Sequence, residues 1–327
     1  MAGGQERILR RRIKSVQSTK KITRAMELIA ASRIVKAQAR VQAAQPYADG
    51  ITEVVRDLQA AGAGANNPLL VPRPETRRVG EVVIAADRGL CGAYNSSVIR
   101  AAEVDVRAQE AQGRETAIVT VGRKPEGYFK FREYPISAAF GGFTQNPTYE
   151  DARAIAAAVV GPFQEGLLDL VQLTYTRFVS AGRQEVVIVP LLPLPSAEVA
   201  ETDHTTSADA EGPSASYEFE PDPDAILDAL LPRYAEARIY AALLNGAASE
   251  HAARQRAMKA ATDNADELIK GLSRVMNRAR QEQITTEIME IVGGAEALEA
   301  ESGEGDHHER FDFGGVRAAL TASHTAH

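Results

Sequence analysis

Two long helical patterns lie at the two ends of the chain, and they constrain the fold more than any other feature. Residues 7–44 contain no Gly or Pro, and their apolar side chains recur mostly at steps of three and four residues, which is typical of one amphipathic helix. Pro46 lacks a backbone donor, so we expect a kink or an end there, with continuation through Leu58 left open. The apolar stripe comprises Leu9, Ile13, Val16, Ile22, Met26, Ile29 and Val41.

The second pattern begins near residues 221–224 and runs to about Leu298, with Pro232, Gly246 and Gly271 as its weak points. Its apolar side chains alternate three- and four-residue steps, the a/d pattern of a coiled-coil seam. The predicted seam comprises Met258, Ala261, Ala265, Leu268, Leu272, Val275 and Ala279. Polar residues 280–283 interrupt it, and a stripe shifted in phase follows at Ile284, Ile288 and Ile291.

A helix over residues 247–298 would extend about 75 Å at 1.5 Å per residue, which is longer than an ordinary domain is wide. It cannot bury its stripe in a globular core, so it needs a companion, and the only comparable stripe belongs to the N-terminal helix. We therefore expect the two ends to form a long antiparallel coiled coil. From the residues alone, two helices packed on a compact bundle remain the alternative.

The middle of the chain has a different period, with short β-rich apolar runs that are typical of buried strands. Two of these runs flank a helical stretch, which predicts a βαβ unit. The predicted elements are strands over 82–86, 116–121, 170–179 and 185–192 and helices over 93–111 and 149–161. The predicted fold class is therefore α/β: a central three-layer α/β (Rossmann-like) domain with a mixed sheet, joined to the coiled coil of the terminal helices.

This pattern divides the chain into five parts. Residues 61–74 read as a linker, and the segment before the last helix is acidic and lacks Lys and Arg, which is typical of a solvated loop. The predicted parts are the N-terminal coiled-coil helix (1–60), the α/β foot domain (75–195), the acidic loop (196–222), the C-terminal long helix (223–298) and a disordered tail (299–327).

Charge and cysteine usage exclude several classes of protein. The net charge of −7 argues against a generally basic nucleic-acid-coating protein, although residues 6–44 alone carry eleven cations and only two acids. A single cysteine, Cys91, excludes an intrachain disulfide and fits a reducing compartment. No stretch approaches the roughly 18 apolar residues of a membrane-spanning helix, so contact with a membrane would be peripheral.

The sequence offers little catalytic chemistry. The turn 87–92 follows a strand and opens a helix, where a phosphate-binding loop would lie, but it lacks the glycine spacing of such loops and is interpreted as a structural turn. Cys91 beside Arg88 could have a lowered thiol pKa, yet no His is near and an inert buried thiol is favoured. His307 and His308 lie in the tail without a hydrophobic framework around them, so we predict no metal site. We also predict no catalytic residue and no cofactor.

Three segments carry a resemblance to a known family: residues 21–33 (KITRAMELIAASR), the turn 87–92 with Tyr94 and Asn95, and residues 258–265 (MKAATDNA) continuing to Thr285. In this order they closely resemble the γ subunit of bacterial F-type ATP synthase, over about residues 1–298. The tail from Glu299 extends beyond the usual end of that family. The resemblance implies a rotor that couples turning of a c-ring to ATP synthesis or hydrolysis, within a head of three α and three β subunits and with an ε subunit.

The same resemblance implies which residues make the contacts and where the complex lies. Arg24, Met26 and Arg254 match positions near a lever loop of β, and Arg280, Gln281 and Thr285 match positions that engage β higher up. Tyr217 and Glu220 match residues that touch the c-ring. The resemblance further implies a peripheral protein on the cytoplasmic side of the bacterial plasma membrane, associated with the membrane only through the c-ring.

Two other functions are compatible with the residues. One is a nucleotide-binding α/β enzyme with a coiled-coil oligomerisation arm. The other is a basic coiled coil that binds nucleic acid, which is disfavoured because the chain is acidic overall and has no interleaved aromatic residues. The family resemblance predicts no nucleic-acid partner.

Overall fold

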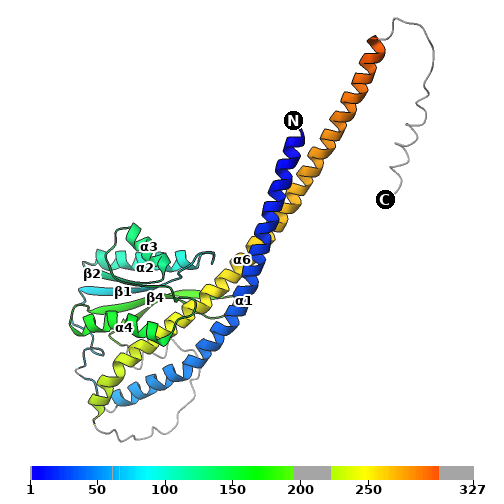
Figure 1. The fold of residues 1–327 in the computed structure, drawn as a ribbon. Coiled ribbons are helices and arrows are strands. Elements are labelled where there is room, and N and C mark those ends of the chain that lie inside the picture. Colours follow the sequence, from blue (N-terminus) through cyan, green and yellow to red (C-terminus); the bar gives the residue numbers. More distant parts are fainter. Residues whose placement is uncertain (1, 61, 66, 195–221, 302–327) are drawn as a thin grey trace. The chain divides into compact units, whose positions relative to one another are not determined.

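The computed structural model describes residues 2–60, 62–65, 67–194 and 222–301 (Figure 1). They fall into two compact units. The larger is Ser18–Asp266, and the smaller combines the two chain ends, Met1–Gln17 and Glu267–His327. The predicted contacts Tyr217 and Glu220, nearly all of the acidic loop and most of the tail lie outside the described residues.

The larger unit contains a sheet of five strands, in the order β3-β2-β1-β4-β5. Strands β1, β2, β3 and β4 run parallel, and β5 is antiparallel to β4 at one edge, so the sheet is mixed as predicted. The order 3-2-1-4 is that of a doubly wound nucleotide-fold sheet. The bounds are Arg78–Ile84 (β1), Glu115–Val121 (β2), Ile136–Phe140 (β3), Leu170–Phe178 (β4) and Gln184–Leu192 (β5).

Helices cover both faces of this sheet, which gives the predicted three layers. Side chains alternate between the faces, so Val83 joins the cluster under α2 (Tyr94–Ala111) and α3 (Arg123–Phe131), whereas Val82 joins the cluster on the other face. That second, larger cluster packs α4 (Tyr149–Gln164), the end of α1 (Ala2–Ala60) and the start of α6 (Pro223–Glu301) against the sheet. The coiled-coil helices are therefore built into the foot domain.

Sequence reasoning missed two elements, α3 and β3. The first contains Pro125 and Gly127, and the second has only five residues, so neither carried a clear period. The expected end or kink at Pro46 is corrected in part, since α1 continues through this residue to Ala60. Pro232, Gly246 and Gly271 likewise lie inside α6.

Within the larger unit, α1 and α6 run antiparallel, as predicted. The hydroxyl oxygens of Thr23 and Thr262 are 2.8 Å apart, and Lys20 forms an ion pair with Asp266, so three residues back along α1 correspond to four residues forward along α6. This pairing fixes the register of the two helices.

The buried stripe of each helix keeps the predicted heptad spacing but differs in phase from the prediction. Leu268 is 57% exposed and Val275 is 51% exposed, whereas their neighbours Ile269 and Met276 face inward. The inward positions of α6 are Met258, Thr262, Ala265, Ile269, Leu272, Met276, Ala279 and Gln283, at alternating steps of four and three.

On α1, Ile22 and Ile29 were predicted to lie in the stripe but are exposed, and Thr23, Glu27 and Ala30 take the inward places. The predicted stripe was therefore wrong at these two positions. The exposed isoleucines stand one residue away from the buried positions, which is why apolar spacing alone selected them.

In the smaller unit the first residues of α1 lie beside the part of α6 that follows Glu267, and the end of α6 extends past them (Figure 1). Ile13 is its buried anchor on α1, and Leu9 and Val16 are half-buried, as predicted. On α6 every residue from Ile284 to Leu298 is exposed, including the whole second stripe.

Glu81 is an unusual residue of the sheet core. It lies on the central strand β1 and is 1% exposed; Thr174 donates a hydrogen bond to its Oε1, and its Oε2 has no partner among the described residues. Burial, helped by the charge of Asp105 and only partly offset by the Thr174 hydrogen bond, raises the pKa of Glu81 to about 8. The carboxyl group is therefore mostly protonated at neutral pH in the folded chain.

We predict that Glu81→Gln raises the free energy of unfolding at pH 7.5 by at least about 1 kcal/mol, because the wild-type carboxyl must take up a proton on folding. The unfolded chain releases this proton near pH 4.5 and the folded chain only near 8, so wild-type stability falls as pH rises between these values. Urea unfolding at pH 5.5 and 7.5 measures the difference, with Glu110→Gln as the exposed control. An equal effect at both pH values would contradict the assignment.

Candidate functional site

A polar layer interrupts the seam of the paired helices where Arg24 and Met26 lie. Thr23 and Thr262 share one hydrogen bond, so the hydroxyl group that accepts it can donate to a carbonyl of its own helix. Buried Glu27 accepts two bonds from Arg24, at 2.8 and 2.9 Å. The Arg24 guanidinium is more than half exposed, so it neutralises Glu27 and still presents a cation outward.

Met26 is half-buried one turn beyond Thr23. Because the helices are antiparallel, it lies at about the level of Lys259, three residues before Thr262. Arg24 and Met26 therefore occupy the same turn of the paired helices. Arg254 lies farther along in the direction of the foot.

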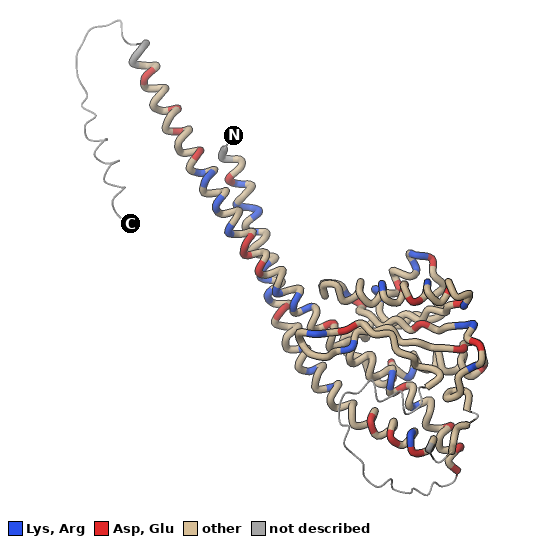
Figure 2. The backbone as a smooth tube through the Cα atoms, turned by 180° about the vertical axis from the view of Figure 1, so that it is seen from behind, with Lys and Arg blue, Asp and Glu red and all other residues tan. Residues whose placement is uncertain are grey.

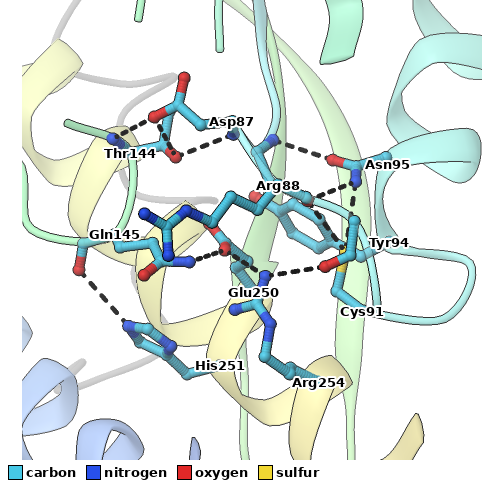
Figure 3. A network of polar contacts seen from close by, with 12 residues as sticks. Asp87, Arg88, Cys91, Tyr94, Asn95, Thr144, Gln145, Glu250, His251 and Arg254 are labelled. Carbon is cyan, nitrogen blue, oxygen red and sulfur yellow. Dashed lines mark hydrogen bonds and ion pairs between the residues drawn. The ribbon is translucent and has the colours of Figure 1, made fainter. Parts of the chain in front are cut away.

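Arg254 is buried, with only 7% exposed, and does not lie on the outer face of α6. Its Nη2 donates to Glu250 Oε1 at 2.7 Å and to the Gly89 carbonyl at 3.2 Å (Figure 3). Its Nη1 has no hydrogen-bond partner among the described residues. This buried cation therefore ties α6 to the turn 87–92 through the Gly89 carbonyl.

The turn 87–92 is filled by its own chain. The Asn95 side chain accepts from the Ala86 amide at 2.9 Å and donates to the Arg88 carbonyl at 3.2 Å (Figure 3). Leu90 is exposed at a φ of 61°, a left-handed backbone that is uncommon for such a residue. The interpretation as a structural turn fits this geometry better than a phosphate-binding loop does.

Cys91 is buried beneath this turn. Burial is the main cause that raises the pKa of its thiol, and the nearby Arg254 charge offsets only part of this effect. The thiol is therefore protonated at neutral pH and is a poor nucleophile, in agreement with the favoured interpretation.

Asp87 fastens the loop 141–148, which connects β3 to α4. Its carboxylate accepts from the backbone amides of Gly142 and Thr144, at 2.8 and 3.2 Å, and from the Thr144 hydroxyl. Partial burial pushes the pKa of Asp87 up, but these hydrogen bonds and one from Arg123 outweigh it and hold the pKa below its usual value. The carboxylate is thus charged and fixed at neutral pH.

A cavity of the larger unit lies elsewhere, between α1, α4 and α6. It has a volume of about 530 Å³ and is lined by Tyr47, Tyr149 and Tyr240 among others. Burial, together with a hydrogen bond donated to Glu236, raises the pKa of Tyr149 above its usual value. The Tyr149 phenol therefore stays protonated at neutral pH and supplies no base.

Arg280, Gln281 and Thr285 lie in the smaller unit and are exposed on α6. The Thr285 hydroxyl donates to the Gln281 carbonyl at 2.9 Å, which uses it within the helix. Arg280 and Gln281 keep their side chains available on the surface of the described chain.

Sequence reasoning missed the roles of three polar residues of the larger unit: Glu250 and His251, which are buried, and Gln145, which is half-buried. Burial is the main cause that lowers the pKa of His251 to about 4, so the ring is neutral. One signal was present in the sequence: Glu250 precedes Arg254 by four residues, the spacing of an ion pair on one helix face.

The described part of the chain has neither a metal-binding cluster nor a membrane-spanning helix. No group of three or more His, Cys, Asp and Glu residues there could hold a metal ion. No described helix is both long enough and apolar enough to cross a membrane.

We predict that Arg254→Met lowers the free energy of unfolding by about 3 kcal/mol, because it leaves Glu250 charged and buried. Urea unfolding of the full chain measures this loss. Arg256→Met, which removes an exposed arginine two residues away, should cost less than about 1 kcal/mol. The double variant Glu250→Gln with Arg254→Met should recover part of the stability, and additive losses would argue against a coupled pair.

Comparison with known proteins places the chain in a family. A family model described as ATP synthase matches residues 5–298. The ATP synthase gamma chain of Parafrankia sp. (strain EAN1pec) is 52% identical over 299 residues, covering 90% of this chain and 98% of that protein. The gamma chain of Mycolicibacterium smegmatis is 48% identical over 306 residues, covering 89% and 97%.

Solved structures agree with this family. A chain of the Tetrahymena thermophila mitochondrial ATP synthase central stalk/c-ring structure has a TM-score of 0.53 and 26% identity, covering 73% of this chain and 99% of that one. A chain of the Euglena gracilis mitochondrial ATP synthase has a TM-score of 0.62 at 18% identity, covering 95% and 100%, and supports the fold. Agreement over nearly the full length of its relatives does not favour the nucleotide-binding enzyme, and the chain belongs to the ATP synthase gamma-chain family.

Proposed function

We propose that this gamma chain works as a shaft whose outward side chains contact the catalytic subunits around it. The chain is a non-catalytic rotor subunit of the central stalk, and it couples rotation to events at catalytic sites on other subunits. The observation that carries the proposal is that apolar side chains of the paired helices point outward and have no cover within the described chain.

The outward face of α1 in the larger unit supports a contact with β. Ile22, Leu28, Ile29 and Val35 are exposed there, among the cations that crowd the first half of α1 (blue in Figure 2). Arg24 and Met26 belong to the same segment. An acidic loop of β would find both an apolar surface and cations on this face.

The last part of α6 supports a second, upper contact. Its exposed apolar side chains are Ile284, Ile288, Met289, Ile291, Val292 and Leu298. Such a surface requires an apolar sleeve, which we assign to the head of three α and three β subunits. Arg280 and Gln281 stand next to it and would meet a polar loop of β.

Rotation acts through differences between contacts. One shaft facing three equivalent β subunits offers each a different surface, and it biases each toward the conformation that fits that surface. Exposed ion pairs contribute only about 0–1 kcal/mol each. We therefore propose that steric contact with the shaft causes most of the conformational change in β, and that the cations of α1 modify it.

The remaining partners are assigned by family. We propose that the foot domain carries the ε subunit and rests on the c-ring, with Tyr217 and Glu220 at that contact. The chain would then lie on the cytoplasmic side of the bacterial plasma membrane and reach the membrane only through the c-ring. Co-purification from membranes tests the assembly: α, β, ε and the c-ring should accompany this chain in fixed proportion, and their absence would refute it.

We predict that Met26→Lys lowers the number of protons pumped per ATP hydrolysed, because it adds a cation where the shaft faces β. Proton pumping and hydrolysis are measured together in inverted membrane vesicles. Val104→Lys adds the same charge to an exposed apolar position of the foot and should leave the ratio unchanged. An unchanged ratio in Met26→Lys would remove this residue from the contact.

We also predict that Arg280→Ala and Gln281→Leu impair assembly or turnover of the complex, because each removes a polar group beside the apolar end of α6. The yield of complex and its rate of ATP hydrolysis are the measurements. Arg278→Ala provides the control, since this arginine is exposed nearby and pairs with Glu282. Wild-type behaviour of both variants would defeat the upper contact.

A further inference from the structure

The loop 141–148 of the foot touches both long helices at one level. From this geometry we propose that Gln145 is a positioning residue: its side-chain amide clamps α1 and α6 to the foot, so that shaft and foot turn together. The inference rests on the rotor function proposed above. In this proposal Gln145, a residue of the foot, helps to transmit rotation between the shaft and the foot.

The side-chain amide of Gln145 forms one hydrogen bond toward α1 and another toward α6. Its Oε1 accepts from Arg33 Nη1 on α1 at 2.7 Å. Its Nε2 donates to Glu250 Oε1 on α6 at 2.9 Å (Figure 3). A group that meets a cation on one side and a carboxylate on the other needs an acceptor and a donor on one rigid plane. The side-chain amide of Gln provides both, an oxygen that accepts and an NH₂ group that donates.

The backbone of Gln145 adds a third tie. Its carbonyl lies 3.4 Å from His251 Nε2, and since a carbonyl can only accept, the ring donates from Nε2. The other ring nitrogen, Nδ1, is then an acceptor, and it has no partner in the described residues. The same loop also holds α1 about two turns farther on, where Arg40 donates to the Asn146 side chain and the Pro147 carbonyl.

The loop is itself held firmly, so the clamp has a rigid base. Asp87 fixes its beginning through Gly142 and Thr144. Thr148 fixes its end, because it caps α4 in a reciprocal capping box with Asp151. Displacing Gln145 would therefore disturb the sheet edge and the start of α4.

The position of the clamp explains why it is polar. The large apolar cluster that packs the helices on the sheet takes its α1 members from Ile51, Val55 and Leu58, and its last member on α6 is Leu243. Glu250 and Arg33 lie beyond these limits. At this level Ala247, Ala248 and Ala252 are the buried apolar residues of α6, and they offer small side chains. Hydrogen bonds take over where apolar packing weakens.

Gln145→Met tests the clamp in the full chain, because it keeps the volume and removes both amide hydrogen bonds. Spin labels at Lys36 on α1 and Lys130 on α3 report how firmly helix and foot are joined, and a second pair at Lys259 and Lys130 reports the α6 side. Every labelled chain carries Cys91→Ser, so that only the introduced sites take a label. The expected result is a broader distance distribution for both pairs, with Gln112→Met in the foot as the unaffected control.

Arg33→Met separates a clamp from a general loss of stability. It removes only the α1 half, so the Lys36–Lys130 distribution should broaden while the Lys259–Lys130 distribution stays narrow. Unchanged distributions in Gln145→Met, or equal broadening of both pairs in Arg33→Met, would overturn the clamp. This readout needs no other subunit, so it stands apart from the proposed function.

The role in rotation is measured in the complete ATP synthase. Gln145→Met should lower the protons pumped per ATP hydrolysed by about twofold, while hydrolysis by the detached head stays at the wild-type rate. Broader distances with an unchanged pumping ratio would overturn the transmission role. If the wild-type chain failed to assemble with α and β, the proposed function would fall, whereas the distance measurements would still decide whether the clamp exists.

Discussion

The pairing of the two chain ends determines the rest of this structure. Along α1 the inward positions recur at alternating steps of three and four residues, from Leu9 in the smaller unit to Leu58 under the sheet. One stripe thus serves first as a coiled-coil seam and then as a layer of the foot's core. Because each long helix uses this stripe on its partner or on the sheet, every other apolar side chain it carries must face outward. An outward apolar face of this extent indicates a surface that other subunits cover.

The seam itself is not uniformly apolar, and the exceptions lie together. Thr23 and Thr262, the Lys20–Asp266 pair and Glu27 form a polar layer that contributes less to stability than apolar side chains would. Polar groups in a seam favour one register, since sliding the helices would separate donors from acceptors. Register matters in a shaft that presents Arg24 and Met26 at one level and the 87–92 turn at another.

Much of the fold could be predicted because its signals are local. Four of the five strands and the helices α2 and α4 were expected near their observed bounds, since each combines an apolar period with a clear break. The phase of the seam could not be settled, because Leu268 stands beside Ile269 and Val275 beside Met276, and period alone does not distinguish neighbours of similar hydropathy. The burial of Arg254 was missed for another reason: its partners, Gly89 and Glu250, come together only after α6 packs on the turn.

The misplaced positions carry information about function. Ile22, Ile29, Leu268 and Val275 were assigned to the seam because a single chain read alone has no other place for an apolar side chain. The structure turns all four outward and fills the seam instead with Thr23, Ala30, Ile269 and Met276. A helix with two apolar stripes, one facing its partner helix and one facing away, is expected where a coiled coil must also turn inside a sleeve of other subunits. We therefore attribute the second stripe to the contacts that the proposed rotor makes with the subunits around it.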